Sequence, residues 1–381
     1  MNRSFTIFWL AGESSGDLHA SKVMQRMNAD FPNLRHVGIG GKLMQEQGLK
    51  PLFPFDRFAI MGFVEVLRHL GFFIKVQNKI RKYIQIDKPD LAILVDYPGL
   101  NLRVARILDD ERIPVLYYIC PQFWAWKRKR VYDLKDNVRH VAVILPFEKE
   151  LLDIYNVSAT YVGHPIAEEI KLELDREAFA RFFGLDPEKQ WIGFLPGSRN
   201  AEISKLLPIF LEAAALLDPD KYQFLFSKAR SVNHHSYMQI MDSAPRLKKY
   251  IIDGYNYELM KYSELLISCS GTATLEAAFI GTPSIVCYKA SPLSYWIGRY
   301  FVRIKRIGLP NIVLEEDVLP ELVQENLTAK TIAANAFRIL SDPDYAAELR
   351  VKLFKLRGLL EGKKTSVEML KIIRKLLKID A

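Results

Sequence analysis

Cysteine is scarce in this sequence. Its 381 residues include 3 cysteines, Cys120, Cys269 and Cys287, which are odd in number and far apart. Such spacing argues against a disulfide framework and against a zinc site with paired ligands. A reducing compartment such as the cytoplasm therefore suits the chain best.

Long apolar stretches are also missing. No uncharged apolar run approaches the roughly 18 residues of a membrane-spanning helix, so we expect any membrane contact to be peripheral. Residues 1–10 have one basic residue and a short apolar run, and the polar segment Glu13-Ser14-Ser15-Gly16-Asp17 follows. This order predicts a first strand and its loop rather than a signal peptide.

Acidic residues are outnumbered by basic ones. The chain has 53 Lys and Arg against 44 Asp and Glu, which leaves a formal net charge of +9. Excess positive charge favours acidic partners, namely nucleic acid, anionic lipid or a phosphorylated substrate. Composition alone does not choose among the three.

Strand-like runs alternate with helical segments along most of the chain, which is typical of α/β proteins with parallel sheets. The length exceeds what one hydrophobic core normally serves, and Gly163-His164-Pro165 interrupts the pattern. We predict two doubly wound, Rossmann-like domains, residues 1–168 and 169–381, facing across a cleft. The last helices are candidates for crossing back to the first domain. Strands are expected at 6–10, 36–39, 91–95, 115–119, 141–144, 160–162, 191–195, 223–226, 250–252, 265–267 and 284–287, and late helices at 329–341, 344–356 and 363–378.

Two loops in the second half have the composition of anion sites. At residues 268–276 a short apolar strand leads through Gly271 into a helix start, where free N–H groups and the helix dipole favour negative charge. Glu276, one turn inside, is placed to accept hydrogen bonds from ligand hydroxyls. Residues 195–202 repeat this order, and Arg199 offers a fork of donors to a diphosphate. The alternatives are a helix start capped by Ser270 or Thr272 and an ordinary surface arginine.

Carboxylates follow two strands of the first half. Asp96 ends the apolar run 91–95, where a general base is expected at the carboxyl end of a strand; a turn-capping Asp is the alternative. The loop at residues 11–17 lacks the G-x-G-x-x-G spacing of a dinucleotide site. Its Glu13 and Asp17 would repel a pyrophosphate and suit sugar hydroxyls, unless the loop only caps a helix.

Two further stretches combine large apolar side chains with cations. Residues 117–130 join aromatic rings to four consecutive basic residues, which suits stacking on sugars or bases. Core packing beside a solvated basic helix is the alternative. Residues 60–83 have more apolar groups than one buried stripe needs, which favours docking on an anionic membrane. Buried helices with a basic outer face remain the alternative. The docking candidates are Phe63, Leu67, Leu70, Phe72, Phe73 and Ile74.

Taken together, these stretches resemble the lipid-A-disaccharide synthase family, glycosyltransferases of the two-domain GT-B architecture. The resemblance spans essentially the whole chain, and it is the order of the motifs that makes it specific. Cys120 is a departure, because Ser is expected before the proline. The motifs are Ala11–Asp17, Val95–Pro98, Trp124–Trp126, Val162–Pro165, Leu195–Arg199 with Glu202, Ser270–Glu276 and Leu309–Asn311.

The resemblance implies a reaction and a set of roles. UDP-2,3-diacylglucosamine and 2,3-diacylglucosamine 1-phosphate would give a β-1,6-linked disaccharide and UDP, with inversion at the anomeric carbon and without metal or other cofactor. Asp96 would be the base, with Glu13 and Asp17 as the next candidates. The remaining residues divide into UDP-sugar contacts at Arg199, Ser198, Tyr255, Ser270, Gly271, Thr272, Glu276 and Asn311, and acceptor or interdomain contacts at Gln122, Trp124 and Trp126.

The same resemblance implies a location and partners. The enzyme would lie on the cytoplasmic face of a bacterial inner membrane, bound to its anionic surface, and a second copy of the chain is a candidate partner. Alternatives with the same architecture are a murein-type N-acetylglucosaminyl transferase and a UDP-sugar epimerase. A basic nucleic-acid-binding protein fits the charge but not the anion loops, so no nucleic acid is expected.

Overall fold

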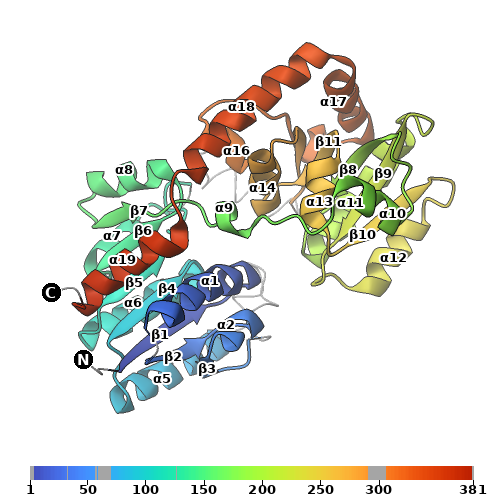
Figure 1. Ribbon diagram of the computed structural model, residues 1–381. Helices are drawn as coiled ribbons and strands as arrows, with labels where there is room; N and C mark the ends of the chain where they lie inside the picture. The colour runs from blue at the N-terminus through green and yellow to red at the C-terminus, as the bar shows by residue number, and fades with distance from the viewer. Residues whose placement is uncertain are drawn as a thin grey trace. The chain divides into compact units, whose positions relative to one another are not determined.

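The computed structural model describes residues 4–31, 33–55, 58, 70–125, 127–290 and 306–379. The chain forms two compact units, one of residues 1–165 with 361–381 and the other of residues 166–360. The division falls between Pro165 and Ile166, where the sequence predicts it between residues 168 and 169. Each unit is a parallel sheet with helices packed against it (Figure 1).

Unit 1 is built on a parallel sheet with the strand order β3-β2-β1-β4-β5-β6-β7. Both faces of the sheet are covered, so its central strands are apolar throughout; every residue of β4 is buried. The strands are β1 (Phe5–Ala11), β2 (Leu34–Ile39), β3 (Leu49–Pro51), β4 (Leu91–Val95), β5 (Val115–Tyr118), β6 (His140–Val143) and β7 (Ala159–Tyr161). The helices are α1 (Ser14–Asp30), α2 (Lys42–Glu46), α5 (Leu70–Ile86), α6 (Pro98–Asp110), α7 (Arg130–Asn137), α8 (Pro146–Ile154) and α19 (Thr365–Leu377).

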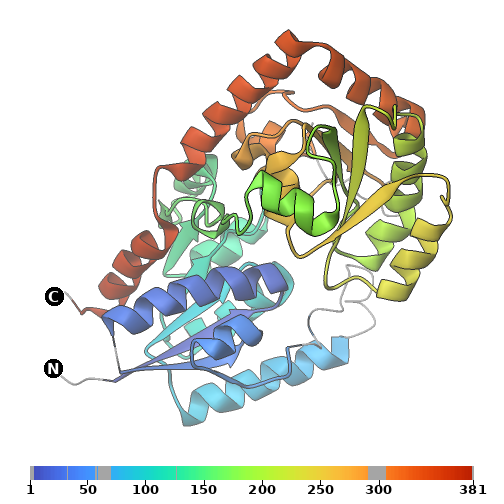
Figure 2. The same cartoon turned by 45° about the vertical axis from the view of Figure 1, so that its right-hand side comes forward.

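The last helix of the chain belongs to unit 1. Helix α19 lies beside α1, as both views show (Figures 1 and 2). Its buried side chains Met369, Leu370 and Ile373 join the core formed by α1 and one face of the sheet. The approach is close at Gly163, where φ is +86° and a Cβ would lie 2.5 Å from the carbonyl oxygen of Lys363. The C-terminal segment is thereby packed tightly onto the unit that holds the N-terminus.

Unit 2 has a second parallel sheet, in the order β10-β9-β8-β11-β12-β13. Strand β11 is buried along its whole length. The strands are β8 (Gln190–Leu195), β9 (Tyr222–Lys228), β10 (Lys249–Asp253), β11 (Leu265–Cys269), β12 (Ser284–Tyr288) and β13 (Glu321–Val323). The helices are α9 (Ile166–Glu169), α10 (Arg176–Phe183), α11 (Asn200–Ala215), α12 (His234–Asp242), α13 (Asn256–Tyr262), α14 (Thr272–Ile280), α16 (Leu309–Val313), η1 (Gln324–Asn326), α17 (Ala329–Ser341) and α18 (Pro343–Glu361).

Buried hydrogen bonds attach the segment before α10 to unit 2. The Glu258 carboxylate is buried and accepts from the N–H groups of Glu173 and Leu174 at 2.5 and 3.2 Å. The Asp175 side chain then caps α10 by accepting from the N–H of Ala178 at 2.8 Å, which stabilises a helix by about 1 kcal/mol. These bonds explain why the second unit begins well before its first strand.

Helix α5 settles part of the membrane-docking prediction. Its buried residues recur at helical spacing and face the sheet: Phe73, Val76, Ile80 and Ile84. Phe73 is 5% exposed, so assigning it to a membrane surface was wrong, whereas Ile74 is 55% exposed. Phe72 is partly buried against the core and packs on Phe58, with ring centroids 5.2 Å apart. Phe63 and Leu67 lie outside the described residues, as does the side chain of Leu70.

Candidate active site

The strand order of unit 1 reverses between β1 and β4, which makes this pair the topological switch point of the sheet. Ala11 pairs with Val95 at the carboxyl ends of the two strands. Asp96 follows Val95 directly, and Glu13 comes two residues after Ala11. Ligands of doubly wound sheets bind at such a switch point, so the fold brings these two carboxylates to the expected place.

The backbone holds Asp96 in an unusual conformation. Asp96 and Tyr97 both have positive φ, 45° and 46°, which costs of order 1–3 kcal/mol at each non-glycine residue. The carbonyl oxygen of Asp96 accepts from Asn101 Nδ2 and from the Tyr117 hydroxyl, both at 2.6 Å. These buried donors, which the sequence analysis missed, hold the main chain of Asp96 in place at the end of β4.

The electrostatic surroundings of Asp96 suit a base. Burial raises the pKa of Asp96 to about 6, and the negative charge of Glu13 adds to this shift. The N–H of Tyr97, through its hydrogen bond, and the nearby His19 and Arg130 act in the opposite direction. A carboxylate with this pKa is ionised at neutral pH yet more basic than an ordinary aspartate, which is what general base catalysis requires.

The loop at residues 11–17 packs directly against the Asp96 turn. A Cβ on Gly12 would lie 2.5 Å from Cδ1 of Tyr97, so only glycine allows the Tyr97 ring to cover this loop. Glu13 precedes α1 and is partly exposed.

Asp17 has a different role from the one predicted. It is 5% exposed, and its carboxylate accepts from the N–H groups of Leu43 and Met44 at 3.2 and 3.0 Å. These are first-turn donors of α2, so Asp17 connects α1 to α2 rather than acting as a catalytic acid or base.

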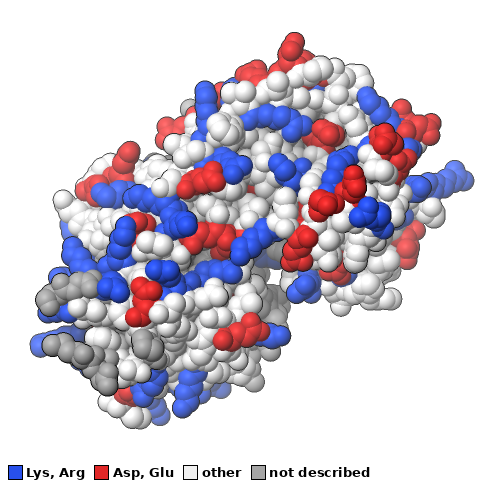
Figure 3. Space-filling view, viewed as in Figure 1, with Lys and Arg blue, Asp and Glu red and all other residues white. Residues whose placement is uncertain are grey.

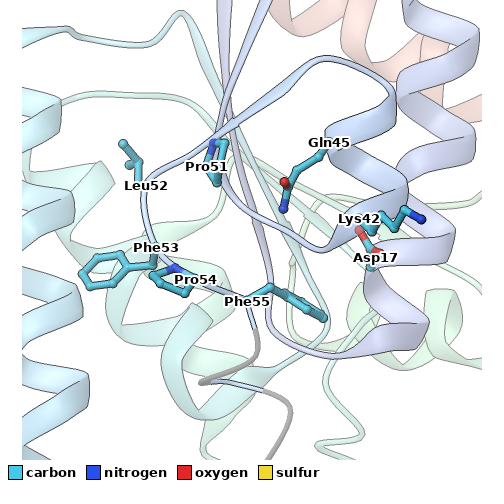
Figure 4. Close-up of a pocket in the computed structure, with 8 residues that line it drawn as sticks. All are labelled: Asp17, Lys42, Gln45, Pro51, Leu52, Phe53, Pro54 and Phe55. Carbon is cyan, nitrogen blue, oxygen red and sulfur yellow. The ribbon is translucent and has the colours of Figure 1, made fainter. Parts of the chain in front are cut away.

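A pocket of about 620 Å³ lies beside this connection in unit 1. Figure 4 shows Asp17 and Lys42 on one side of it and Phe53 and Pro54 on the other. Its lining includes neither Glu13 nor Asp96. The pocket is therefore distinct from the switch point of the sheet.

The aromatic segment after β5 is used mainly for packing. Trp124 is partly buried, donates from Nε1 to Glu148 Oε1 at 3.1 Å and packs on Phe147 with centroids 5.1 Å apart. Glu148 is itself buried, and burial raises its pKa to about 8. Gln122 is exposed and remains a candidate for acceptor contact. Trp126 lies outside the described residues.

Unit 2 has its own switch point, between β8 and β11, where Leu195 pairs with Ser268. The two predicted anion loops follow these strands. Helix α14 begins at Thr272, and the first N–H groups of a helix have no acceptor within it. Apart from Gly271 itself and its two chain neighbours, no atom of the described residues lies within 4 Å of where a Cβ on Gly271 would stand. A ligand can therefore approach this helix start closely.

In this structure the donors of the loop at 195–202 are engaged by a carboxylate of the same loop. Glu202 accepts from the N–H groups of Ser198 and Arg199 at 3.0 and 3.1 Å, and from Arg199 Nη1 at 3.0 Å. A Cβ on Gly197 would lie 2.4 Å from Glu202 Oε2. The Arg199 side chain is 66% exposed. Glu202 thus occupies the position in which an anionic ligand of this loop would accept.

Other UDP-sugar candidates are oriented by neighbouring side chains. The Tyr257 hydroxyl donates to Glu276 Oε1 at 3.4 Å, which holds a partly exposed carboxylate near the start of α14. The Ser270 hydroxyl donates to the carbonyl oxygen of Ile307 at 3.0 Å and so helps to shape the loop. Tyr255 precedes α13, and its ring packs on Phe182 with centroids 5.3 Å apart.

A cation missed at the sequence level lies beside this segment. The Nη2 atom of Arg230, which follows β9, is 4.0 Å from where a Cβ on Gly254 would stand. Ser231 donates to the carbonyl oxygen of Ser198 at 2.7 Å, which joins the loops after β8 and β9. The sequence feature that could have identified Arg230 is its position just after the strand predicted at 223–226.

Asn311 is a structural residue rather than an available donor. It is 1% exposed. Its Nδ2 donates to Leu319 O and Glu321 Oε1, both at 2.8 Å. Its Oδ1 accepts from the N–H groups of Val318 and Leu319 at 3.1 and 2.8 Å. The side chain has no capacity left for a sugar nucleotide, so the predicted contact was wrong for this side chain.

The described residues contain no group of three or more His, Cys, Asp or Glu side chains arranged to hold a metal ion. Within the same residues, no helix is both long and apolar enough to cross a membrane. Lys and Arg side chains are interspersed with Asp and Glu over both units in the view of Figure 3 rather than forming one continuous field.

Solved structures with a similar fold include UDP-sugar enzymes. UDP-GlcNAc 2-epimerase from Neisseria meningitidis, bound to UDP-GlcNAc, matches 98% of this chain and 99% of its own, with a TM-score of 0.63 and 12% identity. A glycotransferase of kitacinnamycin matches 98% of this chain and 100% of its own, with a TM-score of 0.62 and 14% identity. Two doubly wound parallel sheets of this kind define the GT-B class, and the predicted fold class is confirmed.

Sequence comparison identifies the family within that class. The model of the lipid-A-disaccharide synthetase family matches residues 7–374. Lipid-A-disaccharide synthase from Geobacter sulfurreducens is 39% identical over 355 residues, covering 92% of both chains. The enzyme of that name from Nitrosococcus oceani is 38% identical over 355 residues, covering 91% of this chain and 90% of its own. The chain belongs to the lipid-A-disaccharide synthase family and is a glycosyltransferase.

Proposed function

We propose that the enzyme transfers 2,3-diacylglucosamine from UDP to 2,3-diacylglucosamine 1-phosphate, forming a β-1,6-linked disaccharide and UDP. Family membership supports the choice of substrates. The observation that carries the mechanism is Asp96, held at the switch point of unit 1 with its pKa raised to about 6. Unit 1 is assigned the acceptor and unit 2 the donor.

In the proposed reaction, Asp96 accepts the proton of the acceptor 6-hydroxyl as that oxygen attacks the anomeric carbon of the donor. The new C–O bond forms while the bond to the diphosphate breaks, and UDP leaves with the electron pair. One displacement on an α-linked donor yields the β-linked product, so no covalent enzyme intermediate is needed. The transition state has oxocarbenium character, with charge growing on the departing diphosphate.

On the donor side, the N–H groups at Gly271 and Thr272 and the guanidinium of Arg199 are proposed to stabilise that charge. Arg199 is paired with Glu202 in this structure, so binding requires the diphosphate to replace that carboxylate as its acceptor. Glu276, oriented by Tyr257, is proposed to accept from the ribose hydroxyls. The segment 254–256 is proposed to contact the uracil.

The decisive experiment supplies both acyl sugars in detergent micelles and measures UDP and disaccharide together. Asp96→Asn should abolish turnover while UDP still binds, because the amide keeps the size of the side chain but cannot take the proton. Turnover within about tenfold of the native enzyme would place the base elsewhere, and Glu13 would be tested next. Lys135→Ser, a change at an exposed residue near the end of α7, is a control for handling and expression.

The likeness to UDP-GlcNAc 2-epimerase motivates one competing function on the same donor site. Supplying the donor alone separates the two. An epimerase would change the UDP-sugar without any acceptor, whereas the proposed transferase gives no disaccharide and leaves the donor's sugar configuration unchanged.

The acyl chains of both substrates lead us to propose that the enzyme is cytoplasmic and acts at the inner face of the inner membrane. Helix α5 offers a surface for this contact, since Ile74 and Ile86 are 55% and 86% exposed and Lys75 and Lys82 are exposed beside them. Lys75→Glu with Lys82→Glu should reduce flotation with anionic vesicles but leave binding of UDP unchanged. Unaltered flotation would remove α5 from the contact.

A further inference from the structure

The basic residues 127–130, which follow β5, have no role in the mechanism above. The packing of α6 against α7 indicates a role for them. Arg106 on α6 and Asp133 on α7 form an ion pair with an Nη2 to Oδ1 distance of 3.0 Å. Arg103 precedes Arg106 by about one helical turn on α6, and Arg130 precedes Asp133 by about one turn on α7. Both arginines therefore lie next to the ion pair that joins the two helices. Helix α6 follows β4, at whose carboxyl end Asp96 lies, and Arg130 is close enough to Asp96 for its charge to lower the pKa of that carboxyl.

The cations of this group interact with one another and with Asp96. The positive charges of Arg130 and Arg103 lower the pKa of Lys127, after burial, which is the larger cause. Arg130 is half-buried, and burial lowers its pKa, while Tyr117, Asp96 and Asp133 act in the opposite direction. The charges of Asp96 and Asp133 act on Arg130, and the three cations still repel one another near the positive end of the α7 dipole. A doubly charged anion bound among them relieves that repulsion.

We propose that Arg103, Lys127 and Arg130 bind the phosphate of the acceptor sugar. This inference rests on the proposed function. The 6-hydroxyl and the 1-phosphate project from opposite sides of one hexose ring, so the phosphate site has to lie about one sugar from the base. Arg103 lies on α6, Lys127 precedes α7 and Arg130 is the first residue of α7, and a fork of arginine donors matches phosphate oxygens. The site fixes the acceptor so that its 6-hydroxyl, and no other hydroxyl, reaches Asp96.

The test compares the phosphorylated acceptor with 2,3-diacylglucosamine that lacks the phosphate, in nonionic micelles free of anionic lipid. Arg130→Gln should raise KM for the phosphorylated acceptor by about tenfold or more, as loss of a charged hydrogen bond predicts. Assayed at about pH 8, well above the pKa of Asp96 even without the lowering effect of Arg130, the variant should match the native enzyme in its KM for the UDP-sugar and in its kinetics with the unphosphorylated acceptor. Arg130→Lys should recover part of the loss. Lys135→Gln makes the same charge change near the other end of α7 and should alter nothing.

Each other outcome overturns the assignment. An equal loss with both acceptors would mean that Arg130 acts through Asp96 or through folding, which thermal melts of the two variants then separate. An effect that arises only when anionic lipid is added would assign the cluster to the membrane surface. Absence of disaccharide from the native enzyme would instead reject the proposed function itself, so the two failures are distinguishable.

Discussion

The raised pKa of Asp96 makes the pH dependence of turnover a quantitative prediction. With a pKa of about 6, the carboxylate is ~90% ionised at pH 7 and ~10% ionised at pH 5, so kcat/KM should fall about tenfold between these values. With the ordinary value of 3.8, the fall would be below ~10%. The assay follows UDP release at low acceptor concentration across this range. Enzyme held at pH 5 and returned to pH 7 must regain full activity, which separates titration from unfolding.

A single substitution tests the stated cause of the shift. Glu13 raises the pKa of Asp96 through its negative charge, so Glu13→Gln should move the acid midpoint below about 6 and raise the ratio of activity at pH 5 to activity at pH 7. Glu46→Gln, an exposed charge change on the same unit, should leave the midpoint in place. A flat native profile down to pH 5, or a midpoint that rises in Glu13→Gln, would refute this account of the base.

Three predictions concern stability, measured by urea titration. Asn311→Ala should cost about 3 kcal/mol, because it leaves buried donors and acceptors without partners; a loss below about 0.5 kcal/mol would indicate a surface-like site. Gly163→Ala should cost about 2 kcal/mol, since φ is +86° and Lys363 O is 2.5 Å from the new Cβ, and an unchanged midpoint would contradict the tight C-terminal packing. Burial lowers the pKa of His36 from 6.5 to about 4. As pH falls, the unfolded chain therefore binds a proton at His36 before the folded chain does. The contribution of His36 is present above pH 6.5 and is lost as pH falls, by about 3 kcal/mol at pH 4; stability that does not fall over this range would show that His36 is not held neutral.

Much of the fold could be predicted from local patterns in the sequence. Apolar runs between turn residues predicted β4 at its observed bounds, and the late helix at 329–341 matches α17. The three-residue strands β3 and β13 were missed, whereas β7, of the same length, was predicted at 160–162. The difference is that β3 and β13 each contain a charged residue, and β3 ends at Pro51. On α5 the spacing of buried residues distinguishes Phe73 from Ile74 once one face is known to meet a sheet.

The sequence by itself determined which loops follow strands, and with them Asp96, Glu13, Gly271 and Arg199 as polar residues at strand ends. The reason is that short-range propensity and the parallel α/β pattern set where each strand stops.

Only the tertiary structure decided which of these polar residues have partners. Asp17 and Asn311 have hydrogen bonds to segments that fold against them, and Arg199 is paired with Glu202. A capping carboxylate and a catalytic one look alike in a sequence, since the choice depends on which donors the fold brings near. The same holds for Asn101 and Tyr117, whose hydrogen bonds to Asp96 O exist only because β4, β5 and α6 are packed together.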